Sequence, residues 1–136
     1  MNESIVQTSG QASAEIPASR ANVLLVDDDA SLREVMTHLL VDAGYSVASV
    51  SSGFEAIESI RQRAPDIVVS DCAMGDFSGV ALSRVLREIR PGLPILLLTG
   101  HADLESVRAE CQADAVVLHK PVSLQCLVEG IEALLH

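Results

Sequence analysis

The sequence predicts an α/β fold in which five strands alternate with five helices around a single parallel sheet. Short apolar runs recur five times and are separated by segments whose apolar residues follow the helical period. Most of these runs are apolar throughout, which is typical of strands buried on both faces of a sheet. Apolar residues make up 49% of the 136-residue chain, enough for the core of one domain. The aromatic share of only 2% means that this core is aliphatic.

The first strand is predicted at Val23–Val26 and the second at Tyr45–Val50. Between them, the apolar residues from Leu32 to Ala43 keep helical spacing, which predicts the first helix. Ser31 suits the N-cap of this helix, and Asp29 is a second candidate for that cap, where its charge would complement the helix dipole. Gly44 suits the end of the helix.

The same alternation continues to the end of the chain. The second helix is short and ends before Pro65, and Pro91 and Gly92 stop the third. Ser123 is the predicted N-cap of the last helix. The remaining predicted elements are, in order, a helix marked by Phe54, Ile57 and Ile60, a strand at 66–70, a helix at 80–89, a strand at 94–98, a weaker helix at 102–111, a strand at 115–118 and a helix from 123 through Leu134.

Five strand–helix units of this kind suit a doubly wound sandwich with the flavodoxin-like strand order 2-1-3-4-5. Crossovers between parallel strands are right-handed, so helices cover both faces of the sheet. In this order strands 1 and 3 are neighbours, and ligands collect at the carboxyl ends of the strands. The residues that follow the strands are therefore the candidates for a functional site.

Those residues are acids, a hydroxyl and a lysine. Asp27 and Asp28 follow the first strand, Asp71 the third, Thr99 the fourth and Lys120 the fifth. Carboxylates that lie close together raise one another's pKa unless a cation neutralises them, and Mg²⁺ prefers such oxygen ligands. A carboxylate beside a cation and a lysine can itself attack phosphorus and form an aspartyl phosphate. This pattern predicts a site that handles a cation and a phosphoryl group.

Composition narrows the class of protein. The net charge of −10 opposes direct binding of nucleic acid and favours a basic partner surface or a bound cation. Cys72, Cys111 and Cys126 show no zinc-binding spacing, so we expect reduced thiols in a cytoplasmic protein. No run approaches the roughly 18 apolar residues of a membrane span, and the N-terminus lacks the pattern of a secretory signal. Residues 1–20 follow neither the helical nor the strand period and are predicted to be a disordered tail before a domain at 21–136.

Taken together, the strand-end motifs resemble those of a response regulator receiver domain, over about residues 22–136. The segments that carry the resemblance are Val26-Asp27-Asp28-Asp29, Asp71 followed by Met74 and Gly79, Leu98-Thr99-Gly100, and Lys120-Pro121.

The resemblance implies that Asp71 accepts a phosphoryl group from a sensor histidine kinase or a phosphotransfer protein. It implies Mg²⁺ as cofactor, bound by Asp71, by Asp28 directly, by Asp27 through water and by the main-chain carbonyl of Ala73. Thr99 matches the switch hydroxyl of the family and Lys120 its lysine. Such a protein is not an enzyme, apart from slow loss of its own phosphoryl group.

Two positions depart from the family pattern. Gly75 stands where a proline usually follows the methionine, and a glycine at this position loosens the loop. Val117 occupies the position of the aromatic switch residue. Because the chain ends at residue 136, we expect a stand-alone receiver without an output domain. It would signal through the face formed by helix 4, strand 5 and helix 5, by binding a downstream protein or a second copy of itself.

Two alternatives remain at this level. Asp27-x-Asp29-x-Ser31 resembles the nucleophile motif of haloacid-dehalogenase-type phosphatases, in which Asp27 instead of Asp71 would be the residue that takes up the phosphoryl group. A phosphorylation-independent adaptor is the other, since the missing ring at position 117 and the glycine at position 75 both weaken the usual switch.

Overall fold

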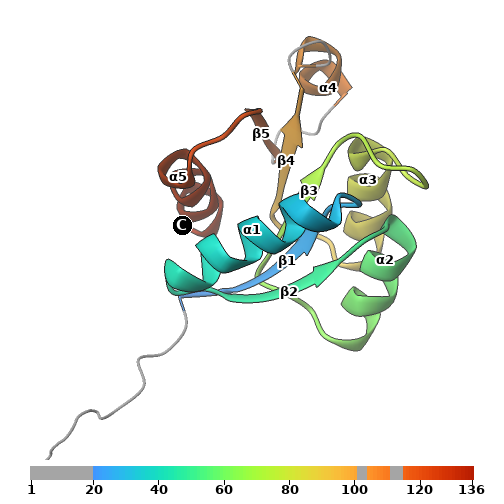
Figure 1. The fold of residues 1–136 in the computed structure, drawn as a ribbon. Coiled ribbons are helices and arrows are strands. Elements are labelled where there is room, and N and C mark those ends of the chain that lie inside the picture. Colours follow the sequence, from blue (N-terminus) through green and yellow to red (C-terminus); the bar gives the residue numbers. More distant parts are fainter. Residues whose placement is uncertain (1–19, 101–103, 111–114) are drawn as a thin grey trace, which may run out of the picture.

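The computed structural model describes residues 20–100, 104–110 and 115–136, and within them strands and helices alternate along the chain (Figure 1). The predicted tail lies outside the described residues except for Arg20, as do the two ends of the helix predicted at 102–111. The elements are β1 (Asn22–Val26), α1 (Ala30–Asp42), β2 (Ser46–Val50), α2 (Gly53–Gln62), β3 (Ile67–Asp71), α3 (Gly79–Ile89), β4 (Ile95–Thr99), α4 (Leu104–Glu110), β5 (Ala115–His119) and α5 (Leu124–Leu135).

The five strands form one parallel sheet in the order β2-β1-β3-β4-β5, which confirms the predicted fold class. The register aligns the carboxyl ends of neighbouring strands to within about one residue. Val26 pairs with Ser70, Asp71 with Leu98, and Thr99 with His119. Side chains that follow these strands therefore emerge along one edge of the sheet.

Two apolar layers hold the helices on the sheet. Alternate residues of the central strands point to opposite faces, as the strand period of two requires. Figure 1 shows α1 and α5 on one side of the sheet and α2 and α3 on the other. The first layer joins strand residues such as Leu25, Val69 and Leu96 to Met36, Leu40, Leu127 and Ile131. The second joins strand residues such as Leu24, Val68 and Leu97 to Ala56, Ile60, Leu86 and Val107.

Of the two N-caps predicted for the first helix, Asp29 is confirmed and Ser31 is wrong. Asp29, not Ser31, caps α1, and its side chain accepts a hydrogen bond of 3.1 Å from the N–H of Leu32. The chain turns into the helix directly after the acidic triplet, so Ser31 already lies within the first turn. A carboxylate at this end also interacts favourably with the helix dipole. The cap predicted at Ser123 is confirmed by its bond to the N–H of Cys126, 3.1 Å long.

The apolar stripe of α1 is wider than its contact with the sheet. Met36 and Leu40 are buried, whereas Leu32, Val35 and Leu39 are 36%, 55% and 39% exposed. These three residues keep helical spacing, but they face the space beside α5 and not the strands.

Among the described helices, none combines the length and the apolar character that a bilayer crossing needs.

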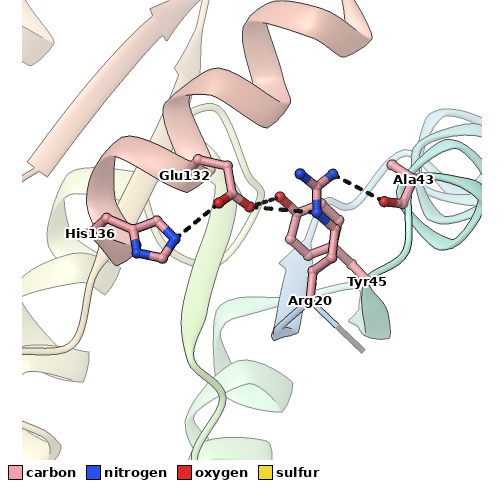
Figure 2. Close-up of polar contacts among 5 residues, drawn as sticks. All are labelled: Arg20, Ala43, Tyr45, Glu132 and His136. Carbon is pink, nitrogen blue, oxygen red and sulfur yellow. Dashed lines mark hydrogen bonds and ion pairs between the residues drawn. The ribbon is translucent and has the colours of Figure 1, made fainter. Parts of the chain in front are cut away.

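Polar contacts tie the start of the described chain to the end of α5 (Figure 2). The Arg20 guanidinium lies over the Tyr45 ring, 5.3 Å from its centre, and donates to the carbonyl of Ala43. The Tyr45 hydroxyl donates to the Glu132 carboxylate, which also lies 3.9 Å from Nε of Arg20 and 3.1 Å from the ring of His136. Burial and the Glu132 carboxylate raise the pKa of Tyr45 to about 12.

This raised pKa predicts a loss of stability at high pH. We expect the free energy of unfolding to fall as the pH rises from 10 to about 12, because the unfolded chain releases the phenol proton at its ordinary pKa of 10.0 while the folded chain retains it. Urea denaturation at a series of pH values measures this slope. Tyr45→Phe should flatten it. An equally steep slope in that variant would contradict the assignment.

Candidate functional site

Four strands deliver polar side chains to one edge of the sheet. Asp27 and Asp28 follow β1, Asp71 is the last residue of β3, Thr99 is the last residue of β4, and Lys120 follows β5. The main-chain N–H of Lys120 donates to the carbonyl of Thr99, at 2.8 Å, which extends the ladder between β4 and β5 by one residue. The structure thus brings together all five side chains that the sequence singled out.

Three carboxylates converge at the centre of this edge. Asp27, Asp28 and Asp71 each offer an oxygen, and these oxygens all lie within 4.8 Å of one another. Asp27 and Asp71 are buried, 1% and 7% exposed, whereas Asp28 is open to solvent. A set of carboxylate oxygens that is accessible from one side suits Mg²⁺, which keeps several of its waters when bound. The donor set therefore fits the cation that the sequence predicts.

The environment of Asp27 shows the cost of crowding these charges. Burial raises the pKa of Asp27 above its ordinary value, and the Asp71 and Asp28 carboxylates add to this effect. The N–H of Asp29, 2.9 Å from Oδ1, and the Lys120 ammonium oppose it without cancelling it. A further positive charge at this edge would therefore favour the ionised form of Asp27.

Lys120 supplies one positive charge at the acid of β3. Its Nζ lies 2.9 Å from Oδ1 of Asp71, and the two side chains are 30% and 8% exposed. The pair is largely shielded from water, so its attraction is stronger than that of an exposed ion pair. The peptide bond between Lys120 and Pro121 is cis.

Thr99 presents an unused donor at the same edge. The residue is 1% exposed, and its Oγ1 has no hydrogen-bond partner among the described residues. Leaving a buried hydroxyl without a partner costs about 1–3 kcal/mol. A phosphoryl oxygen on Asp71 would offer an acceptor, so the orphaned hydroxyl fits the phosphoryl chemistry that the sequence predicts.

The loop after β3 approaches its own base closely. The N–H of Gly79 donates to the carbonyl of Cys72 at 2.8 Å, and a Cβ at position 79 would lie 2.8 Å from the carbonyl oxygen of Asp71. Only glycine permits this contact. The N–H of Ala73 faces Oδ1 of Asp71 at 3.4 Å, so the predicted carbonyl ligand belongs to a residue next to the carboxylates.

Sequence reasoning missed one side chain of this site. Nη1 of Arg33, in the first turn of α1, donates to the main-chain carbonyl of Asp27 at 2.6 Å and holds the acidic segment against the helix. An arginine six residues after an acid is too common a pattern to indicate this contact. Val117, at the position of the expected ring, is partly buried and packs toward the layer of α2 and α3.

Comparisons with known proteins agree with this geometry. The response regulator receiver domain family matches residues 23–132. The transcriptional regulatory protein GlrR of Escherichia coli is 34% identical over 113 residues, which are 82% of this chain and 26% of that protein. The transcriptional regulator NtrC of the same species is 32% identical over 114 residues, which are 83% of this chain and 24% of that protein. The chain therefore spans about a quarter of the length of these relatives.

Solved structures show the same fold. A response regulator receiver protein from Sinorhizobium medicae superposes with a TM-score of 0.77 at 38% identity, covering 87% of this chain and 94% of that one. A receiver domain protein from Clostridium thermocellum gives a TM-score of 0.80 at 29% identity, covering 85% and 94%. Receiver domains typically bind Mg²⁺, in keeping with the carboxylate cluster.

The raised pKa of Asp27 predicts how Mg²⁺ and pH act on stability. Without Mg²⁺, stability should fall as the pH rises from 3.8 through the folded pKa, because the folded chain holds the proton more tightly than the unfolded chain. Asp27→Asn should remove this fall. Mg²⁺ at 100 times its Kd should stabilise the wild type by about 2.7 kcal/mol.

Thermal denaturation with and without Mg²⁺ measures both effects. We expect the Asn variant to be the more stable protein without the cation and to gain little from it. Equal stabilisation of the two proteins by Mg²⁺ would show that Asp27 does not contribute to the cation site.

Proposed function

Because the chain belongs to the response regulator receiver domain family, we propose that the Asp71 carboxylate accepts a phosphoryl group from a phosphohistidine of a sensor histidine kinase or phosphotransfer protein. One observation carries the choice of Asp71. Its carboxylate is the one that contacts the Lys120 ammonium, at 2.9 Å, and it lies within 4.8 Å of the oxygens of two other acids. Asp71 is thus the acid of the cluster that is paired with the positive charge of Lys120.

The chemistry needs positioning and charge neutralisation. An oxygen of Asp71 attacks phosphorus, the phosphorus–nitrogen bond of the phosphohistidine breaks, and the imidazole leaves with the electron pair. The Lys120 ammonium can pair with one phosphoryl oxygen. The Thr99 hydroxyl, which has no hydrogen-bond partner among the described residues, can donate to another phosphoryl oxygen. Mg²⁺, held by Asp28, Asp71 and the carbonyl of Ala73 and through water by Asp27, would supply the remaining positive charge.

Asp71 is a substrate in this scheme, not a turnover catalyst, and slow hydrolysis of the aspartyl phosphate returns it to its starting state. Asp27 is the less suitable nucleophile, because its Oδ1 is engaged by the N–H of Asp29 and no ion pair with Lys120 forms among the described contacts. The geometry and the family match both favour the receiver over a haloacid-dehalogenase-type phosphatase.

A phosphodonor protein also needs a surface near Asp71, and an apolar groove of about 500 Å³ opens beside Lys120, the ion-pair partner of Asp71. Lys120 lies at its margin, so a helix seated in the groove would bring its histidine to the acid. Exposed apolar surface of this kind marks sites of protein contact. The groove is lined by Leu32, Val35, Met36 and Leu39 of α1, Leu98 of β4, residues 120–122, and Leu124 and Leu127 of α5.

We place the output on the face of α4, β5 and α5. Val117 has no ring that could turn inward as Thr99 moves, so the usual aromatic switch is missing. A downstream protein or a second copy of the chain would bind this face according to some other change in it. The competing proposal, an adaptor that ignores phosphorylation, is motivated by the same valine and by Gly75.

One experiment tests whether Asp71 is the phosphoryl acceptor. Incubation with acetyl phosphate and Mg²⁺ should add one phosphoryl group to the wild type and none to Asp71→Asn, because the amide is not a nucleophile at this position. Asp42→Asn, which changes an exposed acid at the far end of α1, should behave like the wild type. Intact-mass spectrometry measures the product. Modification of Asp71→Asn would place the acceptor elsewhere, and partner binding unchanged by beryllofluoride would support the adaptor.

A further experiment tests whether a phosphodonor protein docks in the groove. Val35→Asp places a charge on a groove residue that is 55% exposed, and it should slow phosphotransfer from a phosphohistidine protein by about tenfold or more. Phosphorylation by acetyl phosphate should stay unchanged, because the reacting groups are intact. Val41→Asp is the matched control, since Val41 is a half-exposed residue of the same helix outside the groove. Equal slowing by both variants would rule out a specific docking site there.

A further inference from the structure

The loop that follows Asp71 is fastened to a helix from a different part of the chain. The Asp76 carboxylate accepts hydrogen bonds from the main-chain N–H groups of Gly53, at 3.1 Å, and Phe54, at 3.0 Å, which open α2. It also accepts a bond from the N–H of Phe77, at 2.9 Å. The bonds to Gly53 and Phe54 join residues 23 and 22 positions apart, so they depend on the tertiary fold.

Side-chain packing reinforces this connection. The Phe77 ring lies so close to Gly53 that a Cβ at position 53 would come within 2.3 Å of it. The Phe54 ring contacts the same ring, with 5.1 Å between the ring centres. The loop therefore presses on the first turn of α2 through one carboxylate and one ring, and a glycine at position 53 is required for the fit.

The cap that α2 provides for itself is separate. The Ser52 hydroxyl accepts from the N–H of Glu55 at 3.1 Å, and the Glu55 carboxylate accepts from the N–H of Ser51 at 2.8 Å. Asp76 accepts hydrogen bonds from the N–H groups of Gly53 and Phe54, the two amides of the first turn that the local cap does not bind. Two sets of bonds thus meet at one helix end, and only the set made by Asp76 reaches the loop beside Asp71.

The tethered loop carries the residues nearest the carboxylates. At its base, the N–H of Gly79 binds the carbonyl of Cys72. Between this base and Asp76 lie Ala73, Met74 and Gly75, and nothing approaches the Cβ position of Gly75 within 4 Å. A glycine with open space around it does not restrain a loop. The restraint on Ala73 therefore comes from Met74, which packs against the core, and from the two ends of the loop.

We propose that Asp76 is a positioning residue that, by binding the first turn of α2, holds the Ala73 carbonyl and the Asp71 carboxylate in the arrangement that the cation and the phosphoryl group require. The inference rests on the proposed function. Gly75 cannot restrain the loop, and in this proposal the Asp76 carboxylate, three residues beyond Ala73, does so instead. Outer residues that orient metal ligands commonly change metal affinity tenfold or more when they are replaced.

The test compares Asp76→Asn with Ser52→Ala. The first weakens the bonds between loop and helix, and the second removes the local cap of the same helix without touching the loop. We expect Asp76→Asn to weaken Mg²⁺ binding by about tenfold, measured by calorimetry, and to slow phosphorylation by acetyl phosphate. Amide exchange at Ala73 and Met74, measured without Mg²⁺, should become faster. Ser52→Ala should leave both affinity and exchange near those of the wild type.

Gly53→Ala provides a second route if the Asn variant folds poorly. It raises the helix propensity of α2 and keeps Asp76, but the added methyl group displaces the Phe77 ring, so Mg²⁺ affinity should again fall. Wild-type affinity in Asp76→Asn, or equal losses in Asp76→Asn and Ser52→Ala, would overturn the positioning role. A wild type that binds neither Mg²⁺ nor a phosphoryl group would instead overturn the proposed function.

Discussion

Electrostatic crowding at one edge of the sheet is the constraint on which the rest of the site depends. Three carboxylates lie within 4.8 Å of one another, two of them buried, and one lysine ammonium sits 2.9 Å from Asp71. One positive charge does not balance three negative ones in a place that is largely shielded from water. The site is therefore poised to take up more positive charge, which suits a divalent cation, and to share it with the anionic oxygens of an incoming phosphoryl group.

The fold creates this crowding and also supports it. Parallel strands of equal register end together, so Asp27, Asp71 and Thr99 meet although they are far apart in the sequence. Asp27 and the loop that follows Asp71 are then held from outside the sheet. Arg33 binds the carbonyl of Asp27, the base of the β3–α3 loop closes through Gly79, and the far side of that loop rests on α2 through Asp76. The helices thus contribute to the site through main-chain contacts more than through side chains that would touch a ligand.

The sequence was sufficient to predict the strand order and the five side chains at the edge, because both follow from the period of apolar residues and from what comes directly after each strand. It was insufficient where tertiary packing decides. The choice between Asp29 and Ser31 as the cap of α1 depends on where the helix begins, and Leu32, Val35 and Leu39 line a groove because α5 leaves space beside them. The bonds of Asp76 to α2 have no local signature, since their partners lie more than 20 residues away.

The Mg²⁺ affinity of Lys120→Met tests most directly whether Asp71 is shared between the lysine and the cation. Calorimetric titration of this variant should give tighter Mg²⁺ binding than the wild type, because the ammonium that now pairs with Asp71 repels the cation. Binding of beryllofluoride with Mg²⁺ should weaken in the same variant, since a partner for the phosphoryl oxygens is lost. Mg²⁺ affinity that is unchanged or reduced would show that Lys120 and the cation do not meet at Asp71, and would contradict the arrangement described here.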